Sequence, residues 1–148
     1  AWGEPLSSDQ RAAIERLGAP PQLPADPQAD LVNVLVASHC GRLDRRAARG
    51  IARAQVARDM LMADALVRAV AAYPDHRVVG VMGNQHARRD RGVGYWLQRP
   101  EVRGVGTVVS IGLLPSDTIQ SLTEEARAYD LVRITAPVDR EEPCRTGS

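Results

Sequence analysis

Hydrophobic residues recur at helical spacing over much of the first half of the chain. The segment 7–10 supplies Ser and Asp ahead of a short amphipathic stretch that stops at Gly18, an order typical of a capped helix. Asp26 and Pro27 then place a capping acid and a first-turn proline before the apolar segment 31–37. The β-branched residues of that segment also suit a strand, but capping and spacing favour a helix.

Residues 45–73 are the longest regular stretch, rich in Ala, Arg, Met and Leu and without proline, and they predict one long helix. One face of it is apolar and suits packing against a sheet: Val56, Met60, Ala63, Val67 and Val70. A neighbouring stripe is mixed in character: Gln55, Arg58, Asp59 and Met62. This stripe is either solvated or meets a half of the domain that this chain lacks, and we favour the second interpretation.

Extended segments alternate with helices in the second half. Residues 77–82 are almost continuously apolar, which predicts a strand covered on both faces, and 105–114 and 130–135 are further predicted strands. Residues 117–128 predict a helix, and 92–98 a short helix or an irregular segment. This order indicates the α/β class, with a small, mainly parallel sheet flanked by helices. The sheet is small for so long a helix, so we expect half of a larger α/β domain.

Length and composition limit the possible classes. With 148 residues, 44% hydrophobic and 25% charged, the sequence is that of one globular domain. We divide it into an N-terminal helix and Pro-rich linker (1–25), an α/β domain (26–136) and a tail carrying Cys144 (137–148). The net charge of +1 argues against nucleic acid as a partner. No apolar run is long enough to span a bilayer, and the first residues do not resemble a secretion signal, which processing would remove.

The two cysteines lie far apart and neither belongs to a metal-binding pair. Cys144 sits in a polar tail, where an exposed free thiol would be a liability, so we expect a disulfide between Cys40 and Cys144. Two unrelated free thiols are the alternative. A disulfide would place the protein outside the cytosol.

The most informative segment is the turn that follows the predicted strand at 77–82. Gly83 allows the backbone to turn, and His86 follows at the carboxyl end of the strand, where ligands bind in open α/β sheets. Asn84 is expected to fix the turn or to orient His86. His86 is either a turn residue bonded to backbone or a ligand-binding group, and we favour the ligand-binding role.

Several short motifs occur together in a characteristic order. They are Ser38–Gly41, Arg53–Gln55 with Arg58, Asp59, Met62 and Ala63, Gly83–Arg88 with Asp90–Val93, Tyr129–Asp130, and Glu142–Cys144. Together they resemble the ChaN-like family of iron-regulated, haem-binding bacterial lipoproteins, related to the Tiki, TraB and erythromycin-esterase superfamily, over residues 26–144. The Gly-Glu-x-His segment that opens the N-terminal half of that family is not found here, so the chain resembles the carboxyl-terminal half.

The resemblance implies haem binding in the periplasm or at the outer membrane, with any lipid anchor outside this sequence. It also implies tyrosine as a type of iron ligand, and a homodimer or a partner chain that supplies the other half. Tyr95 lies nearest to His86 along the chain and is the tyrosine candidate, while Tyr73 and Tyr129 are expected to be structural. His86 would coordinate iron or hydrogen-bond a tyrosinate that does.

Arginine and histidine supply the remaining haem candidates. Arg88 and Arg89, with Arg91 beside them, would bind haem propionates in bidentate fashion, or are solvated surface charges. His39, at a predicted helix end, would cap carbonyls there or reach a ligand, and capping is the preferred reading.

Two other functions remain open. The wider superfamily suggests a metal-dependent hydrolase, for which His86 and Asp90 are the candidate ligands, although such a site needs further donors. No Gly-x-Ser-x-Gly turn is found, so we do not expect catalysis. The chain would otherwise be an interaction module whose open sheet edge pairs with a second polypeptide.

Overall fold

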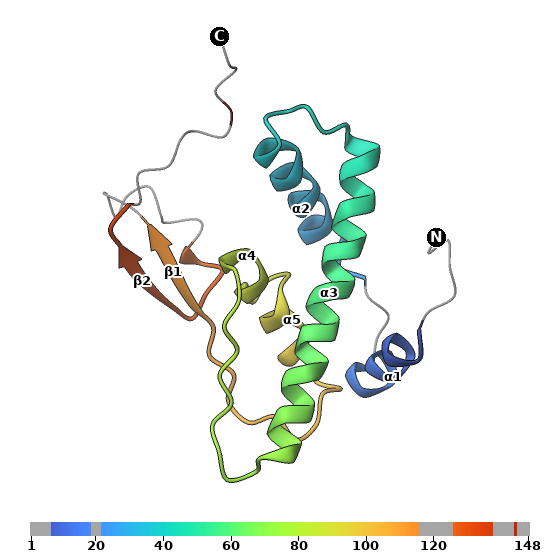
Figure 1. The fold of residues 1–148 in the computed structure, drawn as a ribbon, viewed down its shortest axis with the longest axis vertical. Coiled ribbons are helices and arrows are strands. Elements are labelled where there is room, and N and C mark those ends of the chain that lie inside the picture. Colours follow the sequence, from blue (N-terminus) through green and yellow to red (C-terminus); the bar gives the residue numbers. More distant parts are fainter. Residues whose placement is uncertain (1–6, 19–21, 116–125, 138–143, 145–148) are drawn as a thin grey trace.

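The computed structural model describes residues 7–18, 22–115, 126–137 and 144. It contains the helices α1 (Ser8–Leu17), α2 (Ala25–Ser38), α3 (Arg45–Ala72), α4 (Asn84–Ala87) and α5 (Val93–Leu97), and the strands β1 (Ile111–Pro115) and β2 (Leu131–Thr135). The two strands pair in parallel, with Ile111 opposite Leu131. The fold is therefore α/β with a small parallel sheet, as predicted, and α3 is the long helix at its centre (Figure 1).

The first helix has the predicted caps. Ser7 accepts a hydrogen bond from the backbone N–H of Gln10 at 3.2 Å, and the Gln10 side chain accepts one from the Ser7 N–H at 2.8 Å. Gly18 ends the helix in the left-handed region, at φ 68°. These local interactions satisfy backbone groups that the helix itself leaves unpaired.

The second helix is confirmed, but its start differs from the prediction. Pro24 occupies the N-cap position without a side-chain hydrogen bond, and Asp26 lies in the first turn instead of capping it. A carboxylate there still interacts favourably with the positive end of the helix. The third helix begins one residue after Asp44, whose side chain accepts hydrogen bonds from the N–H groups of Arg46 and Ala47 at 2.7 and 3.1 Å.

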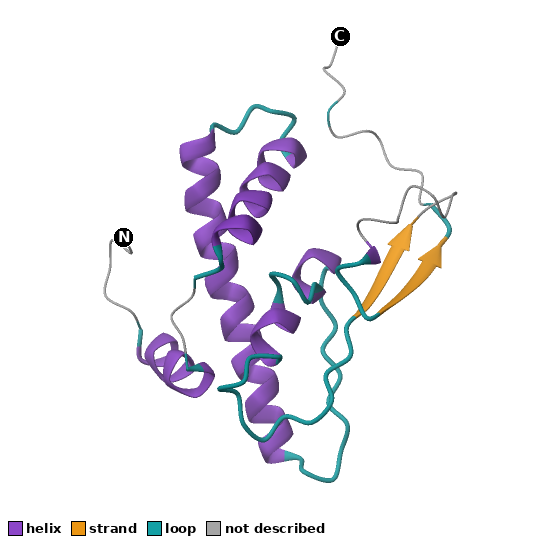
Figure 2. Cartoon of the chain, turned by 180° about the vertical axis from the view of Figure 1, so that it is seen from behind, coloured by secondary structure: helices purple, strands orange, loops and turns teal. Residues whose placement is uncertain are grey.

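The apolar face of α3 packs against other helices. We expected it to cover a sheet, but α3 contacts α1, α2 and α5 (Figures 1 and 2). The largest side chains of this core are fully buried: Leu17, Leu31, Val56, Met60 and Trp96. The sheet prediction was wrong because amphipathic spacing shows that a face is buried without showing what buries it.

The strand predicted at 77–82 does not form. Those residues belong to no strand, and Val79 and Val81 are 81% and 95% exposed. The predicted strand 105–114 is shortened in the same way, since β1 covers only its end. An apolar segment becomes a strand only where a neighbouring backbone pairs with it. The helix predicted at 117–128 lies mostly outside the described residues.

The small sheet is covered on one face. Leu114 of β1 packs with Ala128 and Tyr129, and the Tyr129 ring lies so close to Gly112 that a Cβ there would be 2.8 Å from it. On the opposite face, Ile111 and Leu131 are more than half exposed. None of the helices in the described ranges combines the length and apolar character that crossing a bilayer requires.

Candidate functional site

Helix α4 is a single turn that contacts from β1 and the segment before β2 hold in place. The Asn84 side chain donates to the carbonyl of Leu113 at 2.5 Å and accepts from its N–H at 3.2 Å. The Tyr129 hydroxyl donates to the Asn84 carbonyl at 2.9 Å, and the Ser110 hydroxyl donates to the carbonyl of Ala87. Asn84 thus fixes the turn, one of the two roles we considered for it, and Gly83 is the N-cap of α4.

His86 connects α4 to the middle of α3. Its Nδ1 is hydrogen-bonded to Oδ1 of Asp59, a residue that is only 2% exposed. The His86 side chain is 23% exposed, so part of it reaches solvent. Within the described part of the chain Nε2 has no hydrogen-bond partner. Because Nδ1 is engaged, Nε2 is the ring nitrogen that a ligand would meet.

Burial raises the pKa of Asp59 to about 6, against the opposing effects of the His86 hydrogen bond, the His86 charge and Arg58. The carboxylate form of Asp59 can only accept at this contact, so Nδ1 carries the proton and donates it. This leaves the Nε2 lone pair directed away from Asp59, the arrangement in which histidines bind metals.

Sequence reasoning placed Asp59 on a mixed stripe and did not pair it with His86. The signal was present, because Asp59 follows Val56 and precedes Ala63 at helical spacing on the buried face. An acidic side chain at a core position of a helix needs a partner inside the protein. The sequence alone does not identify that partner, since His86 lies 27 residues further along the chain.

The arginines around the turn are engaged by carboxylates of the chain. Arg88 binds both oxygens of Asp90, at 2.9 and 2.6 Å, and Arg89 binds Asp130 at 2.5 Å. Arg91 is buried, where it pairs with Asp30 and donates to Gln85 at 2.8 Å. Arg91 therefore connects α2 to the turn that carries His86. Of the three arginine side chains, that of Arg89 is the most exposed.

Tyr95 lies on α5, packed against the hydrophobic core. Its hydroxyl accepts a hydrogen bond from Arg99 at 3.3 Å, and its ring meets that of Trp96 edge to face at 5.3 Å. The Arg99 guanidinium also lies 5.9 Å from the centre of the Tyr95 ring.

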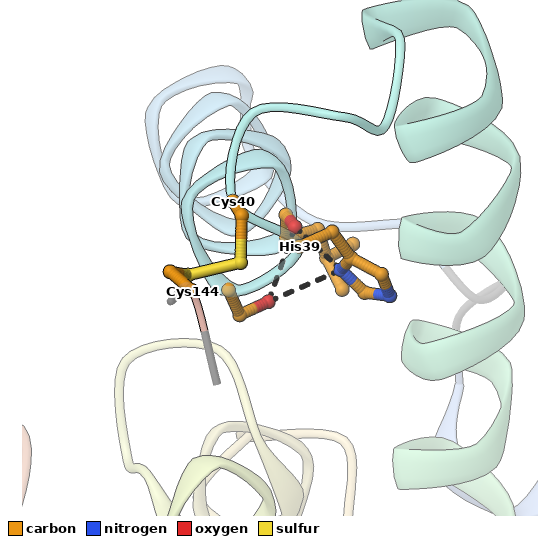
Figure 3. Close-up of a disulfide and its surroundings, with 5 residues drawn as sticks. His39, Cys40 and Cys144 are labelled. Atoms are coloured by element: carbon orange, nitrogen blue, oxygen red, sulfur yellow. Dashed lines mark hydrogen bonds between the residues drawn. A yellow bond between two sulfur atoms is a disulfide. The ribbon is translucent and has the colours of Figure 1, made fainter. Parts of the chain in front are cut away.

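His39 lies at a separate place, the end of α2 (Figure 3). Its Nδ1 is 2.7 Å from the carbonyl of Leu35 and 3.3 Å from the Ser38 hydroxyl, so it caps the helix, the role we preferred for it. Cys40 beside it forms the predicted disulfide with Cys144. An open pocket of about 370 Å³ there is lined by Ser38, His39, Cys40, Arg42 and Leu43. His86 does not line it.

Comparison with known proteins adds one decisive observation. A profile of the family described as "Haem-binding uptake, Tiki superfamily, ChaN" matches residues 4–97, which is more than half of the chain. The chain belongs to this ChaN family. Neither the curated proteins nor the solved structures gave a significant match. The matched residues include Asp59, His86 and Tyr95, whereas β1 and β2 lie outside them.

The family match differs in extent from the resemblance seen in the motifs. It starts before residue 26 and ends at residue 97, so the Tyr129 and Cys144 motifs are not part of it. For the hydrolase alternative, no group of three His, Cys, Asp or Glu side chains in the described residues is placed to hold a metal ion.

Proposed function

We propose that this ChaN-family chain binds haem in bacterial haem and iron uptake, with Nε2 of His86 as the atom that meets the iron. The observation that carries this proposal is the hydrogen bond from His86 Nδ1 to a buried carboxylate, together with the family match. Haem-binding histidines ligate iron through one ring nitrogen and hydrogen-bond through the other. The donor set therefore fits haem, whose iron would supply the coordination chemistry.

The surroundings of the turn also suit a porphyrin. A bound haem needs apolar contact for its ring and positive charge for its propionates. Val79 and Val81 lead into the turn with exposed side chains, and Leu113, bonded through its backbone to Asn84, is exposed beside it. Arg89 is 44% exposed and would exchange its Asp130 partner for a propionate.

The same exposed surface supports a homodimer or a partner chain. The exposed apolar side chains of the sheet and of the segments before it include Val79, Val81, Val109, Ile111, Leu113, Leu131 and Ile134. Apolar surface of this kind is commonly buried against a ligand or a second protein. The disulfide supports a location outside the cytosol, in the periplasm or at the outer membrane, because thiols stay reduced inside the cell.

Titration with haemin tests the proposal. The wild-type chain should give a sharp Soret band that saturates at a defined stoichiometry. H86A should shift or weaken this band, because the iron loses its nitrogen ligand, and Y95F tests the alternative tyrosine ligand. H76A is the matched control, since His76 is an exposed histidine in the turn after α3. If H86A and Y95F both keep the wild-type spectrum, the proposed site is wrong.

A further inference from the structure

Two buried aspartates on α3 have very different partners. Asp64 accepts hydrogen bonds from Arg16 and from Arg68, so positive charge balances it within the chain. Asp59 is equally buried, and its hydrogen-bond partner is the imidazole of His86. Burying a carboxylate is costly unless it is paired. One imidazole is a weaker partner for a buried carboxylate than two guanidinium groups.

Asp59 is not needed to hold the backbone of the turn. Asn84, Ser110 and Tyr129 already bind α4 through hydrogen bonds that involve neither Asp59 nor the His86 ring. Its contact with His86 therefore acts on the ring itself: on its rotation, on which nitrogen carries the proton, and on the basicity of Nε2.

We propose that Asp59 is the positioning residue of the haem site: it holds the His86 ring in the Nδ1–H tautomer, so that Nε2 is the more basic nitrogen and the one that would meet the haem. This inference rests on the proposed function. A carboxylate in this role strengthens the histidine as a donor, and its loss typically weakens metal binding by about 10- to 100-fold.

The first test needs no haem. Nitrogen-15 NMR of the wild-type imidazoles, recorded at mildly alkaline pH, should show His86 as the Nδ1–H tautomer, because Nδ1 is the nitrogen that contacts Asp59. D59A should lose the Nδ1–H signal or shift it toward the Nε2–H form. A wild-type His86 found in the Nε2–H form would overturn the inference, whether or not any variant folds.

The second test measures haemin affinity and the iron reduction potential of D59N against those of D64N. D59N keeps the shape of the side chain but removes its charge, so we expect weaker binding by about 10- to 100-fold and a higher potential, since the histidine donates less electron density. D64N removes an equally buried charge on the same helix and should leave both readouts unchanged. If H86A loses haemin while D59N matches wild type in both readouts, this inference fails and the proposed function stands. If H86A also binds haemin normally, His86 is not the iron ligand, and the proposed function fails as well when Y95F keeps the wild-type spectrum.

Discussion

Asp64 stabilises the fold through its ion pairs with Arg16 and Arg68. The Arg16 hydrogen bond, followed by the charge of Arg16 and the contacts with Arg68, holds the pKa of Asp64 below its ordinary value, although burial acts in the opposite direction. Asp59, on the same helix, has its pKa raised because burial outweighs the effect of His86. Ionisation of Asp64 therefore stabilises the folded protein, whereas ionisation of Asp59 as the pH rises destabilises it.

The pH dependence of D64N tests this contrast. A carboxylate with a depressed folded-state pKa stabilises the protein above its unfolded-state pKa, roughly 3.9, and this contribution is lost as the pH falls through the folded-state value. In urea unfolding, wild type should therefore be more stable than D64N near neutral pH, and the difference should shrink in acid. A difference that stays constant across this range would contradict the assignment.

The residues of the site were predictable to different degrees. His86 was found from sequence because a glycine turn after an apolar segment is a local signal. Its partner was not, since the contact joins residues that only the folding of α3 against the turn brings together. The arginines were recognised as a cluster, but their pairing with Asp30, Asp90 and Asp130 depends on tertiary structure.

At the level of elements, the helices were predicted well and the strands poorly. Helix α1 carries its own caps, and α3 has a continuous run of good helix formers after Asp44. Such signals lie within a few residues of each other. A strand depends on a distant neighbour, and the apolar segment 77–82 has the composition of a strand without a paired backbone in the described residues.

The close packing of the segment between α4 and α5 can be tested by replacing a glycine there with alanine. A Cβ at Gly92 would lie 2.3 Å from the carbonyl oxygen of His86, whereas one at Gly50 within α3 meets nothing within 4 Å. G92A should therefore displace the turn, destabilise the protein by about 1–3 kcal/mol and weaken haemin binding. G50A should stabilise it by roughly 0.5–1 kcal/mol, because alanine is the better helix former.

Thermal and urea unfolding of the two variants, with haemin titration, measure these effects. Equal stability changes in G92A and G50A would show that α4 and α5 do not pack as closely as described.

At the scale of the whole molecule, the disulfide connects the tail to the end of α2. Cys40 and Cys144 are separated by 104 residues, so the bond closes most of the chain into one loop. In the chain-entropy model such a loop stabilises the folded state by roughly 4–5 kcal/mol, because it restricts the unfolded chain. The C40S/C144S double variant should lose stability toward that limit in urea unfolding. Equal unfolding midpoints for the oxidised and the double-variant protein would contradict this role.

The central claim is that His86 ligates haem iron through Nε2. Electron–nuclear double resonance on the ferric haemin complex, with nitrogen-15 placed only in the histidine imidazoles, measures this bond directly. We predict strong nitrogen-15 coupling to the iron in the wild-type protein and in H76A, and its loss in H86A. A wild-type haemin complex without that coupling, or an H86A complex that retains it, would contradict the account.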